Sequence, residues 1–345
     1  AVVQPWRPVV LTVGLATMLV GGWRALRQTD LKRLLAFGTV SQLGFLLVLL
    51  GAGTREAAVA GAALLLAHGL FKSTLFLTVG VIDHATGTRD LRRLSGLGRR
   101  MPVLAVAATL AAASMAGVPP LLGFLGKEAM FAAFATGEPA DTLTLIALVA
   151  GATLTVGYSL RFLWGAFGTR TGVAVSRVTH SPGVGLLAAP VLLSLAGLAG
   201  GLAAPIVERG LSPYPRGLDG FDVHLALWHG LGLPLGLTVL ALAGGYAVFR
   251  LTRGVTARQR TSAGAWSYEQ ALRGVDRLAV ELTGATQRGS LPGYLGLILT
   301  VLVLIAETAL AVGAPWPVAF RVWDTPLQAV AGVAIIAAAV GAVRA

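Results

Sequence analysis

Nine long apolar runs account for most of this 345-residue chain, and each is long enough to form a helix that crosses a lipid bilayer. A crossing helix needs about 20 mostly apolar residues, because the hydrocarbon core is about 30 Å thick. With 55% hydrophobic residues, 12% charged residues and a mean hydropathy of +0.77, the chain is unlike a soluble domain. We therefore predict an all-α, polytopic transmembrane bundle with spans at 9–25, 34–52, 57–82, 103–134, 143–167, 182–204, 225–249, 294–314 and 326–343.

The distribution of basic residues predicts how these spans are oriented. If the spans alternate, one set of loops carries Arg24, Arg27, Lys32, Arg33, Arg89, Arg92, Arg93, Arg99, Arg100, Arg170, Arg177 and most of the later arginines. The opposite loops carry only Arg7, Arg55, Arg209, Arg216 and Arg321. Because cytoplasmic loops are enriched in basic residues, we expect the first residue outside a bacterial plasma membrane and the last residue in the cytoplasm. The net charge of +12 then belongs to a cytoplasmic face, and no nucleic-acid partner is expected.

The fourth run, at 103–134, contains helix-disrupting residues in its middle. These are Gly117, Pro119, Pro120, Gly123 and Gly126. Proline removes a backbone donor and glycine permits irregular dihedral angles, so we predict a broken helix whose freed carbonyl groups face a hydrated interior. Transporters bind ions at such breaks. A proline kink that only improves packing is the alternative, and Lys127 directly after the break favours the ion site.

The stretch 257–290 is too charged to cross a bilayer, although apolar residues such as Trp266, Tyr268 and Leu272 recur in it. This pattern predicts a basic amphipathic helix lying along the cytoplasmic interface, about 50 Å long if it is continuous. A solvated loop is the alternative.

Lysine is rare in this chain and is placed where a fixed charge is costly. Of the 27 basic residues only Lys32, Lys72 and Lys127 are lysine, and the last two lie inside apolar runs. A charge near the bilayer centre costs about 2.5 to 3.5 kcal/mol or more, and a desolvated lysine can release its proton whereas arginine cannot. His68 lies four residues before Lys72 on the same predicted helical face, so the two can exchange a proton directly or through water. A snorkelling lysine beside a core histidine is the alternative.

Three further charged residues are candidates for the same pathway. Glu128 follows Lys127, but adjacent helical residues point about 100° apart, so a direct pair between them is not expected. Lys32 lies at a predicted cytoplasmic helix start and is either a surface charge or part of the proton path. Glu307 lies in an apolar run and either contacts a cation or proton or sits near the outer interface.

No cofactor is expected, because the sequence has no phosphate-binding GxxxxGK[ST] run, no dinucleotide fingerprint and no cysteine. His84, His180, His224 and His229 are scattered without metal-ligand spacing. The energy for transport is expected from an ion gradient or from a partner subunit. The sequence assigns no residue to a Na⁺ route.

Three motifs resemble the antiporter-like subunits, a superfamily that includes proton-pumping subunits of respiratory complex I and the large A subunits of Mrp-type Na⁺/H⁺ antiporters. They are Asp30-Leu-Lys-Arg-Leu-Leu-Ala-Phe-Gly-Thr-Val-Ser-Gln-Leu-Gly44, His68-Gly-Leu-Phe-Lys72 and Gly117-Val-Pro-Pro-Leu-Leu-Gly-Phe-Leu-Gly-Lys127-Glu128. Two further runs, Ile82-Asp-His-Ala-Thr-Gly-Thr-Arg-Asp-Leu91 and Gln287-Arg-Gly-Ser-Leu-Pro-Gly-Tyr-Leu295, are most similar to the branch of the Mrp large subunits.

The resemblance implies a subunit with two inverted five-helix repeats, of which this chain carries the second, so that the chain is expected to be a fragment. It implies that Lys127 is the lysine of the broken helix, that Lys72 and His68 connect to it, and that Lys32 is a further basic residue. Many complex I relatives carry a histidine where this chain has Leu64, so the implied histidine relay is shorter here. The implied divisions are a repeat at 1–170, two spans in 171–256, a lateral helix at 257–291 and two C-terminal spans in 292–345.

These observations lead to three hypotheses. The first is a proton-translocating subunit of a multisubunit Na⁺/H⁺ antiporter, which works with other subunits in the lipid bilayer and moves protons along His68, Lys72 and Lys127. The second keeps this path in a subunit of an NADH dehydrogenase or a membrane-bound hydrogenase. The third is a structural scaffold whose lysines stabilise contacts between subunits.

Overall fold

The computed structural model describes residues 6–180, 182–211, 213–214, 218, 220, 224–253, 263–286, 291–313, 323 and 325–344. These residues form helices and connecting segments, with no strand among them beyond a single bridge between Asp30 and Asp90. The chain divides into two units, residues 1–258 and residues 259–345. The prediction of an all-α fold is confirmed.

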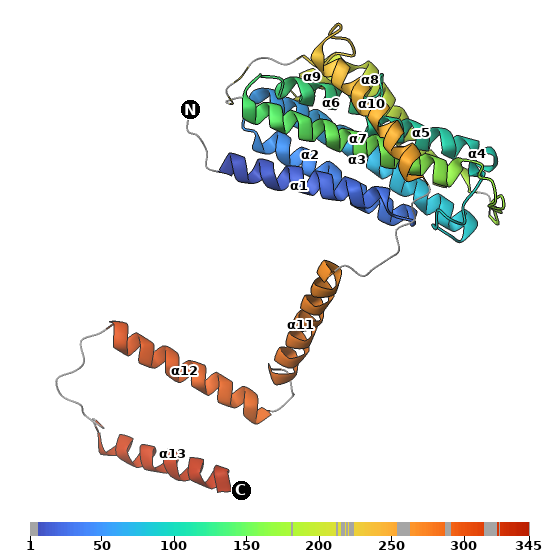
Figure 1. Cartoon of the computed structure of the whole chain (residues 1–345). Coiled ribbons are helices and arrows are strands. Elements are labelled where there is room, and N and C mark those ends of the chain that lie inside the picture. Colours follow the sequence, from blue (N-terminus) through green and yellow to red (C-terminus); the bar gives the residue numbers. More distant parts are fainter. Residues whose placement is uncertain are drawn as a thin grey trace. The chain divides into compact units, whose positions relative to one another are not determined.

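The long helices of the first unit run alongside one another (Figure 1). The helices described in this unit are α1 (Trp6–Leu26), α2 (Leu31–Gly51), α3 (Arg55–Thr86), α4 (Leu97–Arg100), α5 (Pro102–Ala116), α6 (Leu122–Ala133), α7 (Pro139–Phe167), α8 (Val184–Leu202), α9 (Ala204–Leu211) and α10 (Leu233–Thr252). The second unit contains α11 (Ala263–Thr286), α12 (Leu291–Gly313) and α13 (Pro326–Arg344).

Among the described residues, seven helices have the length and hydropathy of a membrane span, namely α1, α2, α3, α7, α8, α10 and α12. α13 is a shorter apolar helix, and α5 and α6 together occupy the fourth predicted span. Each of the nine predicted spans therefore coincides with a helix or with the α5–α6 pair. The polytopic fold and its broken helix are confirmed.

Local sequence sets the ends of the helices around the break. The side chain of Asp30 accepts a hydrogen bond from the Arg33 N–H at 2.9 Å and begins α2, as an N-cap does. Thr54 caps the Ala57 N–H in the same way at the start of α3. Gly117 ends α5 with a φ of +86°, a backbone conformation that glycine adopts without steric cost.

One predicted boundary differs from the structure. The seventh span was expected to begin at residue 225, but α10 begins at Leu233, after Gly230 with a φ of +85° and the N-cap residue Gly232. The apolar side chains of 225–231 resemble a helix in composition, whereas these glycines favour a turn and an extended cap. The non-helical segment 224–232 carries His224 and His229.

The basic loops of the first unit gather at one end of the helices. The N–H of Leu31 donates to the Arg89 carbonyl at 3.0 Å, and Arg170 Nη2 donates to the Leu94 carbonyl at 2.9 Å, so loops distant in sequence are joined. At the opposite end, Arg7 pairs with Asp141 at 3.0 Å, where α1 and α7 begin. The first unit thus has an arginine-rich end and an arginine-poor end.

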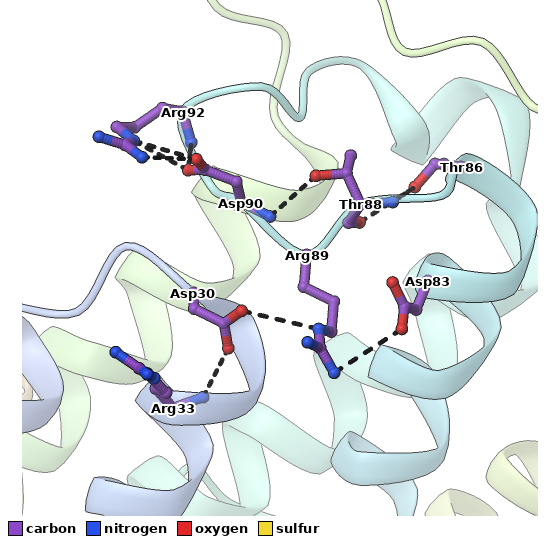
Figure 2. A network of polar contacts seen from close by, with 8 residues as sticks. All are labelled: Asp30, Arg33, Asp83, Thr86, Thr88, Arg89, Asp90 and Arg92. Atoms are coloured by element: carbon purple, nitrogen blue, oxygen red, sulfur yellow. Dashed lines mark hydrogen bonds and ion pairs between the residues drawn. The ribbon is translucent and has the colours of Figure 1, made fainter.

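Figure 2 shows how ion pairs connect two of these loops at the arginine-rich end. Arg89 lies between two carboxylates, with Nε 3.6 Å from Asp30 Oδ2 and Nη1 3.8 Å from Asp83 Oδ2. Arg92 Nη2 lies 2.7 Å from Asp90 Oδ2, and this hydrogen-bonded guanidinium lowers the pKa of the Asp90 carboxyl group from its ordinary value.

In the second unit, α11 coincides with most of the predicted interfacial helix. Its 24 residues span about 36 Å. Its apolar side chains, including Trp266 and Tyr268, are exposed among the described residues. The prediction of a helix over a loop is confirmed for 263–286, while 257–262 and 287–290 lie outside the described residues. Its position along a membrane interface stays a prediction.

Candidate functional site

The break between α5 and α6 brings two helix ends against each other. The N–H of Gly117 donates to the Ala113 and Ser114 carbonyls at 3.0 and 3.1 Å, which closes the end of α5. The N–H of Gly123, in the first turn of α6, donates to Ser114 Oγ at 3.1 Å. A Cβ atom at Gly123 would collide with the Ser114 carbonyl, so only glycine permits this close approach.

Lys127 extends from α6 across the end of α5. The residue is only 2% exposed, and its Nζ lies 3.4 Å from the carbonyl oxygen of Ala116. The last carbonyl groups of a helix carry a partial negative charge, so the end of α5 is a favourable place for an ammonium group. A Cβ atom at Gly117 would lie 2.8 Å from Lys127 Cδ. The glycine therefore leaves the space that the lysine stem occupies.

Lys72 is buried in α3 and is bound by α2. The residue is 5% exposed, and its Nζ donates to the Leu35 carbonyl at 3.0 Å. Gly38, one turn further along α2, faces the same ammonium group, because a Cβ atom there would lie 3.1 Å from Lys72 Nζ. Among the described residues neither Lys72 nor Lys127 forms an ion pair.

His68 lies one turn before Lys72 in α3, as its spacing predicted. Its ring contacts Phe71 edge-on, with 5.4 Å between the ring centroids. Its Nδ1 is buried and has no hydrogen-bond partner among the described residues. A buried ring nitrogen without a partner is a place where an ordered water molecule or a neighbouring proton donor would bind.

One face of α2 connects the two lysines. This face carries, at helical spacing, Leu35, Gly38, Gln42 and Phe45. Lys72 lies against Leu35 and Gly38, and Lys127 Nζ lies 5.7 Å from the centroid of the Phe45 ring. Ten residues of helix separate Leu35 from Phe45, which is about 15 Å. The two lysines are therefore close to opposite ends of a single buried stripe.

Polar side chains occupy the middle of this stripe. Gln42 Nε2 donates to Tyr158 Oη at 3.0 Å and to Thr155 Oγ1 at 3.2 Å, and all three residues are buried. Gln42 Oε1 is buried without a hydrogen-bond partner among the described residues. These three residues were not predicted from the sequence, because single polar side chains in apolar spans carry no spacing signal by themselves.

Leu64 occupies the place where the resemblance implies a histidine in many relatives. It packs against Gly126, whose Cβ position would lie 2.9 Å from the Leu64 backbone nitrogen. α3 and α6 therefore approach each other closely at the residue that precedes Lys127. Because the leucine side chain cannot bind a proton, residue 64 contributes no group to a proton relay at this turn of α3.

Glu128 contacts a histidine that no sequence pattern connected with it. The residue is 4% exposed, and its Oε2 lies 3.6 Å from His229 Nδ1. The described ion pairs thus join Glu128 to the 224–232 segment and not to Lys127. The two partners are far apart in the chain, so no local pattern could have predicted this pair.

Lys32 and Glu307 lie apart from these buried groups. Lys32 is exposed in the first turn of α2, at the arginine-rich end. Glu307 lies in α12 of the second unit and is exposed among the described residues. Their roles stay predictions. No group of three or more potential metal-ligating side chains occurs in the described part of the chain.

The fold and site define a polytopic helical membrane protein with two buried lysines beside a broken helix. Residues 1–155 match the family described as NADH:quinone oxidoreductase/Mrp antiporter, transmembrane. The chain is similar to the A subunits of Na⁺/H⁺ antiporters, which confirms the resemblance stated from its motifs.

Two relatives indicate the extent of this similarity. The A/B subunit of a probable K⁺/H⁺ antiporter of Rhizobium meliloti is 42% identical over 260 residues, which are 72% of this chain and 26% of that protein. The A subunit of the Na⁺/H⁺ antiporter of Alkalihalophilus pseudofirmus is 33% identical over 87% of this chain and 42% of its own length. The chain thus spans less than half the length of these relatives.

Two solved structures also contain chains that are similar to this one. A chain of the Mrp complex from Dietzia sp. is 32% identical, with a TM-score of 0.67, and the match covers 97% of this chain and 37% of that one. A chain of respiratory complex I from Thermus thermophilus is 25% identical, with a TM-score of 0.53, over 71% of this chain and 45% of that one.

Proposed function

We propose that this chain forms a proton-translocating part of the large subunit of an antiporter complex that exchanges a monovalent cation for protons. The observation that carries the proposal is the pair Lys72 and Lys127, buried at two ends of one α2 stripe and each held by a backbone carbonyl. A carbonyl stabilises an ammonium group without fixing its charge as a carboxylate would, so the lysine can alternate between protonated and neutral forms.

In this proposal protons move in steps along His68, Lys72 and Lys127. The partnerless His68 Nδ1 and Gln42 Oε1 are sites for ordered water molecules that would bridge the longer gaps. Coupling to the cation is electrostatic, because a cation that approaches a buried lysine favours the neutral form of that lysine. Glu307 remains a candidate contact for the cation, and Lys32 a candidate contact at the entrance of the path.

The gathering of basic loops supports an orientation for this path. We assign the arginine-rich end to the cytoplasm by the positive-inside rule, with the first residue outside and the last residue inside a bacterial plasma membrane. Residues 1–170 would form the half-channel repeat, and α11 would lie against other subunits of the complex.

A redox-driven pump is the second candidate, favoured by the likeness to respiratory complex I. Inverted membrane vesicles that contain the complete complex separate the two. The antiporter proposal expects that Na⁺ or K⁺ collapses an imposed pH gradient and that NADH alone generates none. Acidification of the vesicles by NADH without any response to Na⁺ or K⁺ would support the redox pump instead. A scaffold without a proton path would retain full exchange after Lys72 and Lys127 are both replaced by alanine.

A further inference from the structure

We propose that His229 passes protons between the solvent at the arginine-poor end and Glu128, which adjoins Lys127. The proposal rests on the proposed function, because it supplies an access route to the same buried lysine. No sequence motif predicts this route, because the route depends on how 224–232 packs against α6 and α9.

The contact between His229 and Glu128 joins an accessible group to a buried one. The His229 side chain is 44% exposed, whereas the Glu128 side chain is 5% exposed. Their 3.6 Å separation is within the range of charge attraction and slightly beyond a hydrogen bond, so a small movement joins them. Glu128 lies five residues before the end of α6, which places it about 8 Å from that end.

The partner on the other side of the ring fixes which nitrogen carries the mobile proton. His229 Nε2 lies 2.9 Å from the His224 carbonyl oxygen, and a carbonyl can only accept, so Nε2 carries a hydrogen atom. Nδ1 is then the nitrogen that gains and loses the proton. In the transfer, the Nδ1–H bond of the imidazolium breaks and a new O–H bond forms at Glu128 Oε2. The products are neutral His229 and a neutral carboxylic acid, and the reverse step restores both charges.

Glu208 holds the segment that orients His229. This α9 carboxylate places Oε1 3.0 Å from His224 Nδ1 and accepts the Leu225 N–H with Oε2 at 2.9 Å. The two carboxylate oxygens of Glu208 therefore bind the consecutive residues His224 and Leu225. These two contacts fix the direction of the His224 carbonyl group. Glu208 is a positioning residue in this arrangement.

Other charged and titratable groups lie on the helices around α6 and 224–232. Among the described residues of the helices packed against α6, and of α9, they are Lys127 on α6, Arg55, Glu56, His68, Lys72, Asp83 and His84 on α3, Asp141 and Arg161 on α7, Glu208 and Arg209 on α9, and Arg250 on α10. α5 and α8 contribute none. Asp141 pairs with Arg7, and Arg250 lies in the last turn of α10, away from the start of that helix. Glu128 is the neighbour of Lys127 in α6, so a proton on Glu128 reaches the helix turn that carries the buried lysine.

The test compares His229→Gln and His229→Ala in the complete complex in inverted vesicles. Glutamine still donates a hydrogen bond to the His224 carbonyl but cannot carry a proton. We expect cation-dependent exchange to fall about tenfold or more in both variants while the complex stays assembled. Added imidazole should restore part of the rate in His229→Ala. The matched control is His180→Gln, an exposed histidine at the arginine-rich end, which should exchange at the wild-type rate.

Wild-type exchange in His229→Gln would overturn the relay, and so would a slow His229→Ala variant that imidazole does not restore, because that result indicates a structural role. Parallel measurements on Lys127→Ala separate the two proposals. Loss of exchange in Lys127→Ala together with full exchange in His229→Gln refutes the relay alone. Full exchange in Lys127→Ala refutes the proposed function itself.

Discussion

The ammonium group of Lys127 lies 3.4 Å from the carbonyl oxygen of Ala116, the last residue of α5. The broken helix thus supplies a helix C-terminus at the position of a buried lysine. The partial negative charge at that terminus offsets part of the cost of a buried ammonium group, while leaving the lysine free to lose its proton. This relationship connects the Gly-Val-Pro-Pro break at 117–120 with the proposed proton path.

Gly117→Ala tests whether the break holds Lys127 in place. A Cβ atom there would lie 2.8 Å from Lys127 Cδ, and a φ of +86° would strain alanine by about 1 to 2 kcal/mol. We expect lower thermal stability and a drop of about tenfold or more in cation-dependent proton exchange, because small displacements of a reacting group cost much rate. Assays of thermal unfolding in detergent and of exchange in vesicles measure the two effects.

Gly137→Ala is the matched control for this variant. Gly137 has a φ of +84° and no atom within 4 Å of its Cβ position, so the backbone strain is similar and no lysine is displaced. We expect a comparable loss of stability and normal exchange. Equal loss of exchange in the two variants would assign the effect to backbone strain and remove the role of the Gly117 space.

Lys72→Arg tests whether Lys72 must release its proton. Arginine keeps the positive charge but holds its proton under all biological conditions, so we expect an assembled complex with no measurable exchange. Lys32→Arg asks the same question of Lys32, the candidate at the entrance of the path, because Lys32 is exposed in the first turn of α2 and the substitution also preserves its charge. We expect normal exchange in that variant if Lys32 is a surface charge. Full activity in Lys72→Arg would remove Lys72 from the mechanism.

Asp90 and Arg92 predict a pH dependence of stability at the arginine-rich end. Because the pKa of Asp90 is lowered from 3.8, chiefly by its hydrogen bonds to Arg92, the pair stabilises the fold above that pH. The stabilisation is lost as the pH falls through the lower value of the folded state. We expect the melting temperature Tm to decrease on acidification, and to decrease less in Arg92→Gln.

Arg99→Gln is the control for Arg92→Gln, since Arg99 is an exposed arginine in α4 and the change in charge is the same. On acidification the Tm of Arg99→Gln should decrease as much as the Tm of the wild type. If the Tm of Arg92→Gln also decreases as much as that of the wild type, the Asp90–Arg92 pair does not contribute measurably to stability. A small effect is expected in any case, because the Asp90–Arg92 pair lies at the surface, where solvent screens it.

Much of this fold follows from local sequence. Apolar runs predicted where the long helices lie, and the prolines and glycines of 117–126 predicted the break, because these signals act within one or two helical turns. The burial of Lys72 and Lys127 followed from their apolar neighbours. The start of α10 was misplaced, because an apolar composition is shared by helices and by the irregular segment 225–231.

The contacts of the site depended on tertiary structure. The Leu35 carbonyl that binds Lys72 belongs to another helix, and the Gln42–Tyr158 pair joins residues 116 positions apart. His229 was grouped with scattered histidines, since its partner Glu128 becomes visible only when 224–232 packs against α6. Long-range pairs of single polar residues leave no periodic signal in one sequence.

The most direct test of the proposed function is the collapse of a pH gradient by Na⁺ or K⁺ in inverted vesicles that contain the complete complex. Wild type is compared with Lys127→Ala and Lys127→Arg, at equal amounts of assembled complex. We predict cation-dependent collapse in the wild type and none in either variant, because alanine carries no proton and arginine does not release one. Cation-dependent collapse at the wild-type rate in Lys127→Ala would contradict a proton path through Lys127.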